Sequence, residues 1–190
     1  MSSPAPPMAF REFERLSPNR DAAAHERLGA LFHHSELGFA ETVARMLDPE
    51  SRVSYHCLID LDGTRCALVP DAQVAWHAGV SRFLGRDRCN DFLLGVAFAG
   101  DTYRAPLSVQ QIASALEWLE PRWAQFGWGI GRIADHRQVS PGRKRDLNPA
   151  EWDGLIGAIA AHFGRGAPRD RVSGLKSSPR SRRKNHPQFP

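Results

Sequence analysis

The sequence contains no long hydrophobic run. The longest nearly apolar stretches in its 190 residues, 93–100 and 154–161, have 8 residues each, whereas a helix that crosses a bilayer needs about 20. This excludes a membrane-spanning helix. Residues 1–20 mix Pro, Ser, Glu and Arg without an apolar segment, so we expect no secretory signal and a cytoplasmic protein.

Cysteine is scarce as well. Cys57, Cys66 and Cys89 are the three in the chain, and an odd, sparse set does not match the dense, even frameworks of small secreted domains. We therefore expect reduced thiols, which agrees with a cytoplasmic location.

An excess of positive charge occurs only at the C-terminal end. Residues 164–190 hold eight Lys or Arg and one acid, a net charge of +7, and the whole chain has +4, so residues 1–163 carry −3. The tail lacks the apolar residues that would offset the entropy of ordering, so we predict disorder over 164–190. We predict a flexible arm over the Pro/Ser-rich residues 1–20 and one compact domain over 21–163. Nucleic-acid binding is not expected, because no aromatic residue is interleaved among the basic ones and the domain is acidic.

Strand and helix signals alternate within the domain. Residues 29–34 and 53–59 are predicted strands, and the Asp62-Gly63 turn predicts a hairpin that returns over 65–69. The run 92–99 is typical of a buried central strand.

The helix signals are capping residues followed by apolar positions at helical spacing. Ser108 and Gln111 form a capping box, although Pro121 is expected to kink or split the helix that follows. Asn148 predicts the start of the last helix and Gly164 its end. The sequence therefore predicts an α/β fold: one domain with a central mixed β-sheet flanked by helices on both faces.

Three places offer side chains that suit a zinc ion: His33-His34 at the end of the first strand, His136 after another predicted strand, and Asp146 before the last helix. Two imidazoles and a carboxylate would leave the fourth tetrahedral position to water, as in catalytic zinc sites. Because strand side chains alternate, only one of His33 and His34 can face the metal. Eight histidines make chance groupings common, so spacing alone leaves open that these are strand-end residues hydrogen-bonded to the backbone.

Four ordered segments carry a family resemblance. They are RVSYHCLI at 52–59, AWHAGVS at 75–81, GRDRCNDF at 85–92 and HRQVSPGRKRD at 136–146. They resemble the zinc-dependent N-acetylmuramoyl-L-alanine amidases and are most similar to the anhydro-muramoyl branch used in cell-wall recycling. The resemblance implies the fold of the peptidoglycan-recognition and amidase domains.

The resemblance also implies a zinc site. It gives His33, His136 and Asp146 as the ligands, with His33 preferred over His34 because the family ligand closes the first strand at that place. Lys144 matches the lysine that the family directs at the developing oxyanion, where a fixed cation stabilises the charge of the transition state. The neighbouring residues 143 and 145, both arginines, are expected to be solvated.

The family's substrate contacts correspond to four further residues. Arg52 and Arg88 carry guanidinium groups that suit the carboxylates of a muramoyl peptide. Trp76 and His77 would line the groove. The alternative for these two is structural: Trp76 in the core, and His77 holding a loop by hydrogen bonds.

The chain departs from the anhydro branch at the catalytic position. Ala97 stands where that branch has a catalytic glutamate, and Tyr55 where it has a small residue. Phage lysozyme-type amidases and animal peptidoglycan-recognition amidases resemble this chain in having a tyrosine there. We therefore predict that Tyr55 and Lys144 form the working catalytic pair, with the tyrosine hydroxyl orienting the attacking water. Glu36 is an alternative base that no family motif supports, and His34 replaces an asparagine, which leaves sugar recognition open.

The expected function is zinc-dependent hydrolysis of the amide bond between N-acetylmuramic acid and L-alanine in muropeptides or anhydro-muropeptides. An endolysin-like amidase that acts on intact peptidoglycan is one alternative, since a basic tail could hold anionic wall polymers. A non-catalytic peptidoglycan-binding module is the other, suggested by Ala97.

Overall fold

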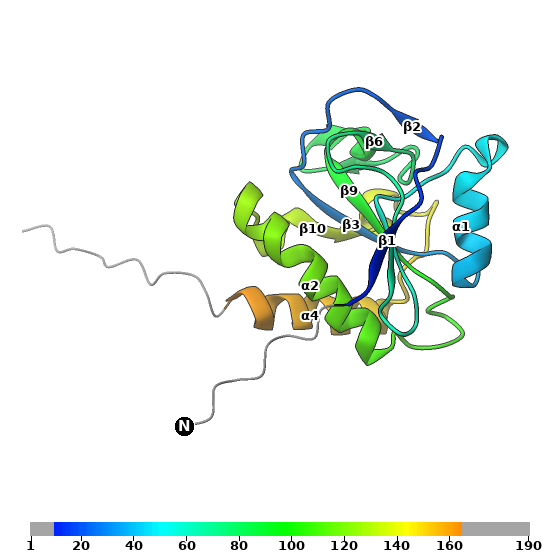
Figure 1. Ribbon diagram of the computed structural model, residues 1–190. Helices are drawn as coiled ribbons and strands as arrows, with labels where there is room; N and C mark the ends of the chain where they lie inside the picture. Colours follow the sequence, from blue (N-terminus) through cyan, green and yellow to red (C-terminus); the bar gives the residue numbers. More distant parts are fainter. Residues whose placement is uncertain (1–9, 165–190) are drawn as a thin grey trace, which may run out of the picture.

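The computed structural model describes residues 10–164 and is built around a six-stranded mixed sheet (Figure 1). The strand order is β1-β5-β4-β9-β3-β10. The strands are β1 (Glu12–Glu14), β3 (Gly29–His34), β4 (Cys57–Ile59), β5 (Arg65–Ala67), β9 (Leu93–Phe98) and β10 (Ile133–Asp135). Strand β3 pairs in parallel with both β9 and β10, whereas β4 and β5 form an antiparallel hairpin. The predicted mixed sheet is confirmed.

Four helices and several short elements complete the fold. The helices are α1 (Phe39–Leu47), α2 (Val109–Phe126), α3 (His136–Val139) and α4 (Pro149–Phe163). Two small antiparallel pairs consist of β2 (Arg20–Asp21) with β6 (Val74–Ala75), and β7 (Arg82–Phe83) with β8 (Arg86–Asp87). Single 3₁₀ turns span Pro49–Ser51, Cys89–Asp91 and Ile130–Arg132.

The two faces of the sheet bury different cores. On one face, Val96 and Phe98 of β9 pack with α2 and α4. On the other face, Ala97 of the same strand belongs to a smaller cluster with Met46 of α1. Figure 1 shows α2 and α4 together on one side of the sheet and α1 on the other. Because side chains alternate along a strand, His33 shares the face of Ala97, its neighbour across the β3–β9 ladder, and is directed away from the larger core.

The helix caps predicted from the sequence are confirmed. Ser108 and Gln111 form the capping box of α2, and Asn148 caps α4 through its side chain. Of the expected kink or split at Pro121, the split is wrong, because the helix runs unbroken from Val109 to Phe126. Trp118 and Leu119 before the proline are buried in the larger core, so packing outweighs the hydrogen bond that proline cannot donate.

The second predicted strand is shorter than expected. Only Cys57–Ile59 forms β4, because the backbone before it bonds to several different partners rather than to one neighbour. The Ser54 amide donates to Trp76 O at 3.0 Å, and the His56 amide donates to Gly95 O at 2.9 Å. Tyr55 therefore lies in the irregular segment that leads into β4.

The predicted flexible arm over residues 1–20 is wrong for its second half. Residues 12–14 form β1, which pairs in parallel with β5 at the edge of the sheet. The buried Arg65 side chain on β5 donates to Glu12 at 2.7 Å and to Glu117 at 2.9 Å, tying β1 to α2. The Pro/Ser content of residues 1–20 does not indicate this charge pairing. Residues 1–9 and the predicted disordered tail beyond Gly164 lie outside the described residues.

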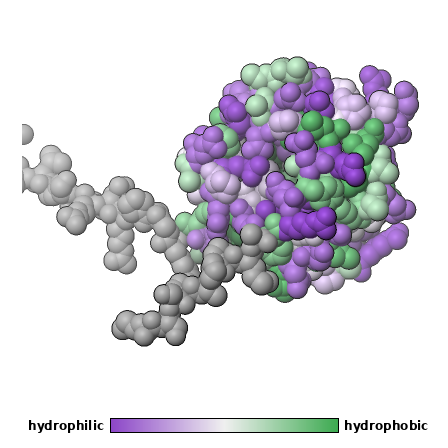
Figure 2. Space-filling model, in the orientation of Figure 1, coloured by the Kyte–Doolittle hydropathy of each residue, from purple (hydrophilic) through white to green (hydrophobic). Residues whose placement is uncertain are grey.

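Exposed hydrophobic residues are scattered over the side of residues 10–164 that Figure 2 shows. Figure 2 shows hydrophilic and hydrophobic residues intermixed on the visible side, and large exposed hydrophobic residues such as Leu61, Val80 and Val109 come from separate segments. Among residues 10–164, no helix has the length and hydropathy needed to cross a membrane.

Candidate active site

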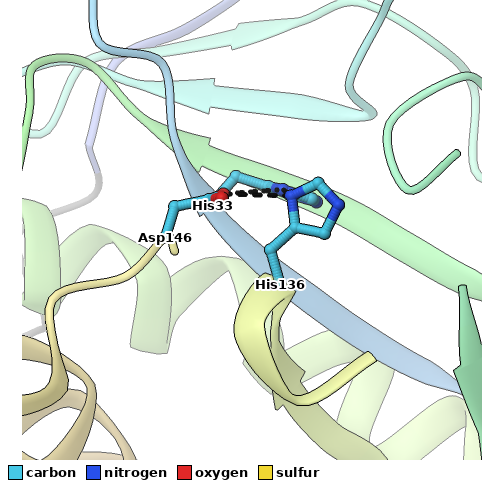
Figure 3. A group of neighbouring side chains, drawn as sticks. All are labelled: His33, His136 and Asp146. Carbon is cyan, nitrogen blue, oxygen red and sulfur yellow. Dashed lines mark hydrogen bonds and ion pairs between the residues drawn. The ribbon is translucent and has the colours of Figure 1, made fainter. Parts of the chain in front are cut away.

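Two parallel strands bring the two candidate histidine ligands together. His33 lies near the carboxyl end of β3, and β10 beside it ends at Asp135, which pairs with Phe32. His136 follows directly and opens α3. Asp146 approaches from the loop that precedes α4 (Figure 3). The parallel register therefore places residues 33 and 136 at one edge of the sheet, although they are distant in the sequence.

The three side chains converge on one point. The distance from His33 Nδ1 to His136 Nδ1 is 3.0 Å, and Asp146 Oδ2 lies 3.2 Å from the first nitrogen and 3.1 Å from the second. All three residues are buried. Ligands about 2.0–2.2 Å from a tetrahedral zinc ion lie about 3.3 Å from one another, so these separations fit a single zinc ion.

Asp146 is held firmly by its neighbours in the chain. Leu147 is fully buried in the larger core, and the amide of Asn148 donates to Thr102 Oγ1 at 2.9 Å. The carbonyl of Asp146 accepts from the Arg137 amide at 3.1 Å. The carboxylate is thus fixed between the core and α3.

Hydrogen bonding at His136 is consistent with a cation at the convergence. Its Nε2 lies 3.1 Å from the carbonyl oxygen of Ala78, and since a carbonyl only accepts, Nε2 carries the proton. In a neutral ring, Nδ1 then presents a lone pair to the carboxylate of Asp146. Lone pairs this close repel one another unless a positive charge lies between them. The donor set of two imidazoles and a carboxylate is one that zinc takes.

A cavity of about 370 Å³ opens beside this cluster. Its lining includes the predicted catalytic residues Tyr55 and Lys144 and the predicted groove residues Trp76 and His77. It also includes His136 and Asp146 of the candidate metal site. These predicted site residues are therefore brought together.

Arg52 and Arg88 are not brought into the cavity. Arg52 is exposed after the 3₁₀ turn at residues 49–51. Arg88 is exposed and paired with Asp91 at 2.8 Å. Their predicted roles as substrate contacts remain predictions without support from the cavity lining.

Three other arginines line the cavity and were missed by the sequence reasoning: Arg45 of α1, Arg143 and Arg145. Arg143 is exposed, as expected, but its guanidinium also donates to the carbonyls of Ala78 and Val80. Arg145 lies over the ring of Tyr103 at 4.7 Å. No local sequence pattern indicates that Arg45 or Arg145 lines a cavity.

Tyr55 lies between Ala97 and the candidate metal site. Its ring is 5.3 Å from that of His33, and it packs against the cluster that contains Ala97. Burial, together with the charge of Asp146, raises the pKa of Tyr55. The hydroxyl therefore stays protonated and can donate a hydrogen bond, but it cannot act as a base near neutral pH.

Lys144 lies close enough to the cluster to act on it electrostatically. Burial lowers the pKa of His33 to about 4, and the charges of His136 and Lys144 contribute in the same direction. Lys144 is exposed toward the cavity, with its backbone amide bonded to Ser140 O at 3.0 Å. It is a cation at the mouth of the site.

His34 and His77 take positions that the sequence left open. Nδ1 of His34 accepts from the Thr102 amide at 3.1 Å, so this ring supports the loop that also contacts Asn148. His77 is buried, and its Nδ1 and Nε2 both have hydrogen-bond partners, at His33 and Leu93 O. His77 thus lines the cavity and also bonds to a candidate ligand, and its predicted role in the groove stays a prediction.

Comparison with known proteins identifies relatives. The family described as N-acetylmuramoyl-L-alanine amidase matches residues 24–150. The 1,6-anhydro-N-acetylmuramyl-L-alanine amidase AmpD of Salmonella typhimurium (strain SL1344) is 38% identical over 112 residues, which are 57% of this chain and 58% of that protein. The chain thus spans little more than half the length of the curated relatives it matches.

Solved structures agree with this fold. A selenomethionine derivative of AmpD has a TM-score of 0.67 at 26% identity and covers 79% of this chain and 94% of that one. AmiD from E. coli, in a complex with anhydro-N-acetylmuramic acid-L-Ala-D-gamma-Glu-L-Lys, has a TM-score of 0.60 at 25% identity, with 72% and 59% covered.

The buried histidines predict how stability depends on pH. Burial lowers the pKa of His56 from 6.5 to about 3, so below pH 6.5 the unfolded chain takes up a proton that the folded chain does not. The free energy of unfolding is then greatest above pH 6.5 and falls toward pH 3, by about 1.4 kcal/mol per pH unit for each such histidine. Urea unfolding of the metal-free protein at pH 7, 6 and 5 measures this slope. The variant His56→Gln should reduce it by that amount, and an unchanged slope would contradict the assignment.

Proposed function

Because the chain belongs to the N-acetylmuramoyl-L-alanine amidase family, we propose that it hydrolyses the amide bond between N-acetylmuramic acid and L-alanine. We place this activity on soluble muropeptides or anhydro-muropeptides in the cytoplasm, in cell-wall recycling. The observation that carries the proposal is the convergence of His33, His136 and Asp146 beside the cavity. The AmiD structure supports the substrate class, since its bound ligand contains anhydro-N-acetylmuramic acid joined to L-Ala.

The three converging side chains would hold a zinc ion. Zinc in such a site supplies Lewis-acid chemistry, polarising the carbonyl of the scissile amide and lowering the pKa of a water. The fixed orientation of His136 by Ala78 O and of Asp146 by the core keeps the donor atoms in place.

The chain's own residues would carry the remaining steps. The Tyr55 hydroxyl, which stays protonated, donates a hydrogen bond that positions the attacking water or the leaving amine. The Lys144 ammonium stabilises the negative charge that develops on the carbonyl oxygen. Ala97 supplies no acid or base, and Tyr55 fills the space beside it.

Positive charge in the cavity lining supports an anionic substrate. Arg45, Arg143, Lys144 and Arg145 stand against two carboxylates, those of Glu36 and Asp146. Within residues 10–164, Arg45 makes no ion pair. We take its guanidinium to contact a carboxylate of the stem peptide, a role that the resemblance gave to Arg52 and Arg88.

The proposal is tested by incubating the purified protein with a soluble anhydro-muropeptide and with intact sacculi. We expect release of a peptide that begins with L-alanine from the soluble substrate, detected by mass spectrometry. A chelator should abolish the release and added zinc should restore it. Release from sacculi alone would favour the endolysin-like alternative, and binding without release would favour the non-catalytic module.

Tyr55→Phe tests the proposed catalytic pair. Loss of the hydroxyl should lower kcat about 100-fold while the zinc content and the unfolding midpoint stay unchanged. The chain has two tyrosines, so Tyr103→Phe is the matched control and should retain turnover. Full turnover of Tyr55→Phe with zinc bound would remove Tyr55 from the mechanism.

Paired arginine variants test recognition of the peptide. Arg45→Gln should raise KM about tenfold through loss of a charge-assisted hydrogen bond, whereas Arg52→Gln should change it little. With a substrate whose peptide carboxylates are amidated, the difference between the variants should disappear. A larger effect for Arg52→Gln would return the contact to the position that the family motif indicates.

A further inference from the structure

His77 contacts His33 on the side away from the candidate metal position. His33 Nε2 lies 3.0 Å from His77 Nδ1, and His77 Nε2 lies 3.0 Å from the carbonyl oxygen of Leu93. The three groups form a continuous row from the backbone of β9 to the ligand atom His33 Nδ1.

The carbonyl at the end of this row sets the proton positions. Leu93 O can only accept, so His77 Nε2 carries a proton. The His77 ring also contacts His33, His56 and Gly95, none of which is a carboxylate, so no counter-charge supports a second proton on the ring. Its Nδ1 is then an acceptor, His33 Nε2 must donate to it, and His33 Nδ1 is left with a lone pair.

Ala78, the residue after His77, supports His136 in the same way. Ala78 O accepts from His136 Nε2 at 3.1 Å. Asn90 Oδ1 accepts from the amide of His77 at 3.0 Å and from the amide of Ala78 at 2.7 Å. One asparagine side chain thus fixes the two adjacent residues that contact the two histidines.

Strand β9 leaves space for the His77 ring at Gly95. A Cβ atom at Gly95 would lie 2.5 Å from His77 Cγ, which no side chain could tolerate without displacing the ring. Gly95 is therefore required for the imidazole to lie between β9 and His33.

We infer that His77 and Ala78, held by Asn90, form a support that fixes the proton positions of both histidine ligands, with His77 as the positioning residue for His33. The inference rests on the proposed zinc site and adds to it. It changes the role of His77 from a groove contact to a group that acts through His33. Outer partners of this kind typically alter metal affinity by about 10-fold to 100-fold.

The first test requires no zinc and no substrate. Nitrogen-15 NMR of the metal-free wild-type protein should show His33 protonated at Nε2 and unprotonated at Nδ1. A proton on His33 Nδ1 would overturn the inference, whatever the enzyme's activity. This outcome is independent of the proposed function, which fails if the zinc-loaded wild-type protein does not cleave a soluble muropeptide.

The second test measures zinc affinity by competition with a chromophoric chelator. His77→Phe should weaken it about 10-fold to 100-fold, and His77→Asn, which can present an amide oxygen near the position of Nδ1, should restore most of the loss. His25→Phe is the matched control, since buried His25 also contacts Leu93 O, at 3.2 Å, but not His33. Equal affinities for His77→Phe and wild type would refute the positioning role.

Asn90 provides a variant farther from the metal position. Asn90→Ala should weaken zinc binding several-fold, whereas Asn90→Asp keeps the accepting oxygen and should bind zinc as the wild type does. If Asn90→Ala lowers only the unfolding midpoint and leaves zinc affinity unchanged, Asn90 has a structural role alone and the proposed support is wrong.

Discussion

The convergence of three electron-pair donors at the end of β3 is the constraint on which the site depends. His33, His136 and Asp146 approach within 3.2 Å of one another, and this arrangement is unfavourable without a cation between them. It persists because the parallel pairing of β3 with β10 sets the two histidines side by side and because Leu147 fixes the aspartate to the core. The energy of sheet pairing and core packing thus maintains a geometry that the ligands alone would not adopt.

Much of the fold could be predicted from the sequence, because its signals are local. The capping box at Ser108 and the cap at Asn148 act over two or three residues, and the strand at 29–34 contains the short apolar run 30–32. The errors arose where distant contacts override local tendencies. Burial of Trp118 and Leu119 keeps α2 intact through Pro121, and the pairing of Arg65 with Glu12 orders a segment whose composition indicates an arm.

The site likewise contains residues that the sequence indicates and contacts that it does not. The family motifs indicated His33, His136, Asp146, Tyr55 and Lys144, and the structure brings these residues together. Motifs could not reveal the contacts made by backbone carbonyls, such as those of Ala78 and Leu93, because a carbonyl has no residue identity in the sequence. Nor could they place Arg45 in the cavity lining, since that depends on how α1 packs on the sheet.

The position of β1 has a consequence for shortening the chain. β1 occupies one edge of the sheet, where its backbone pairs with β5. A fragment that began at residue 21, the domain boundary that composition favours, would leave the amides and carbonyls of β5 without partners along that side. Bare edges of this kind pair with strands of other molecules, so such a fragment would tend to aggregate even though every residue of the metal cluster is retained.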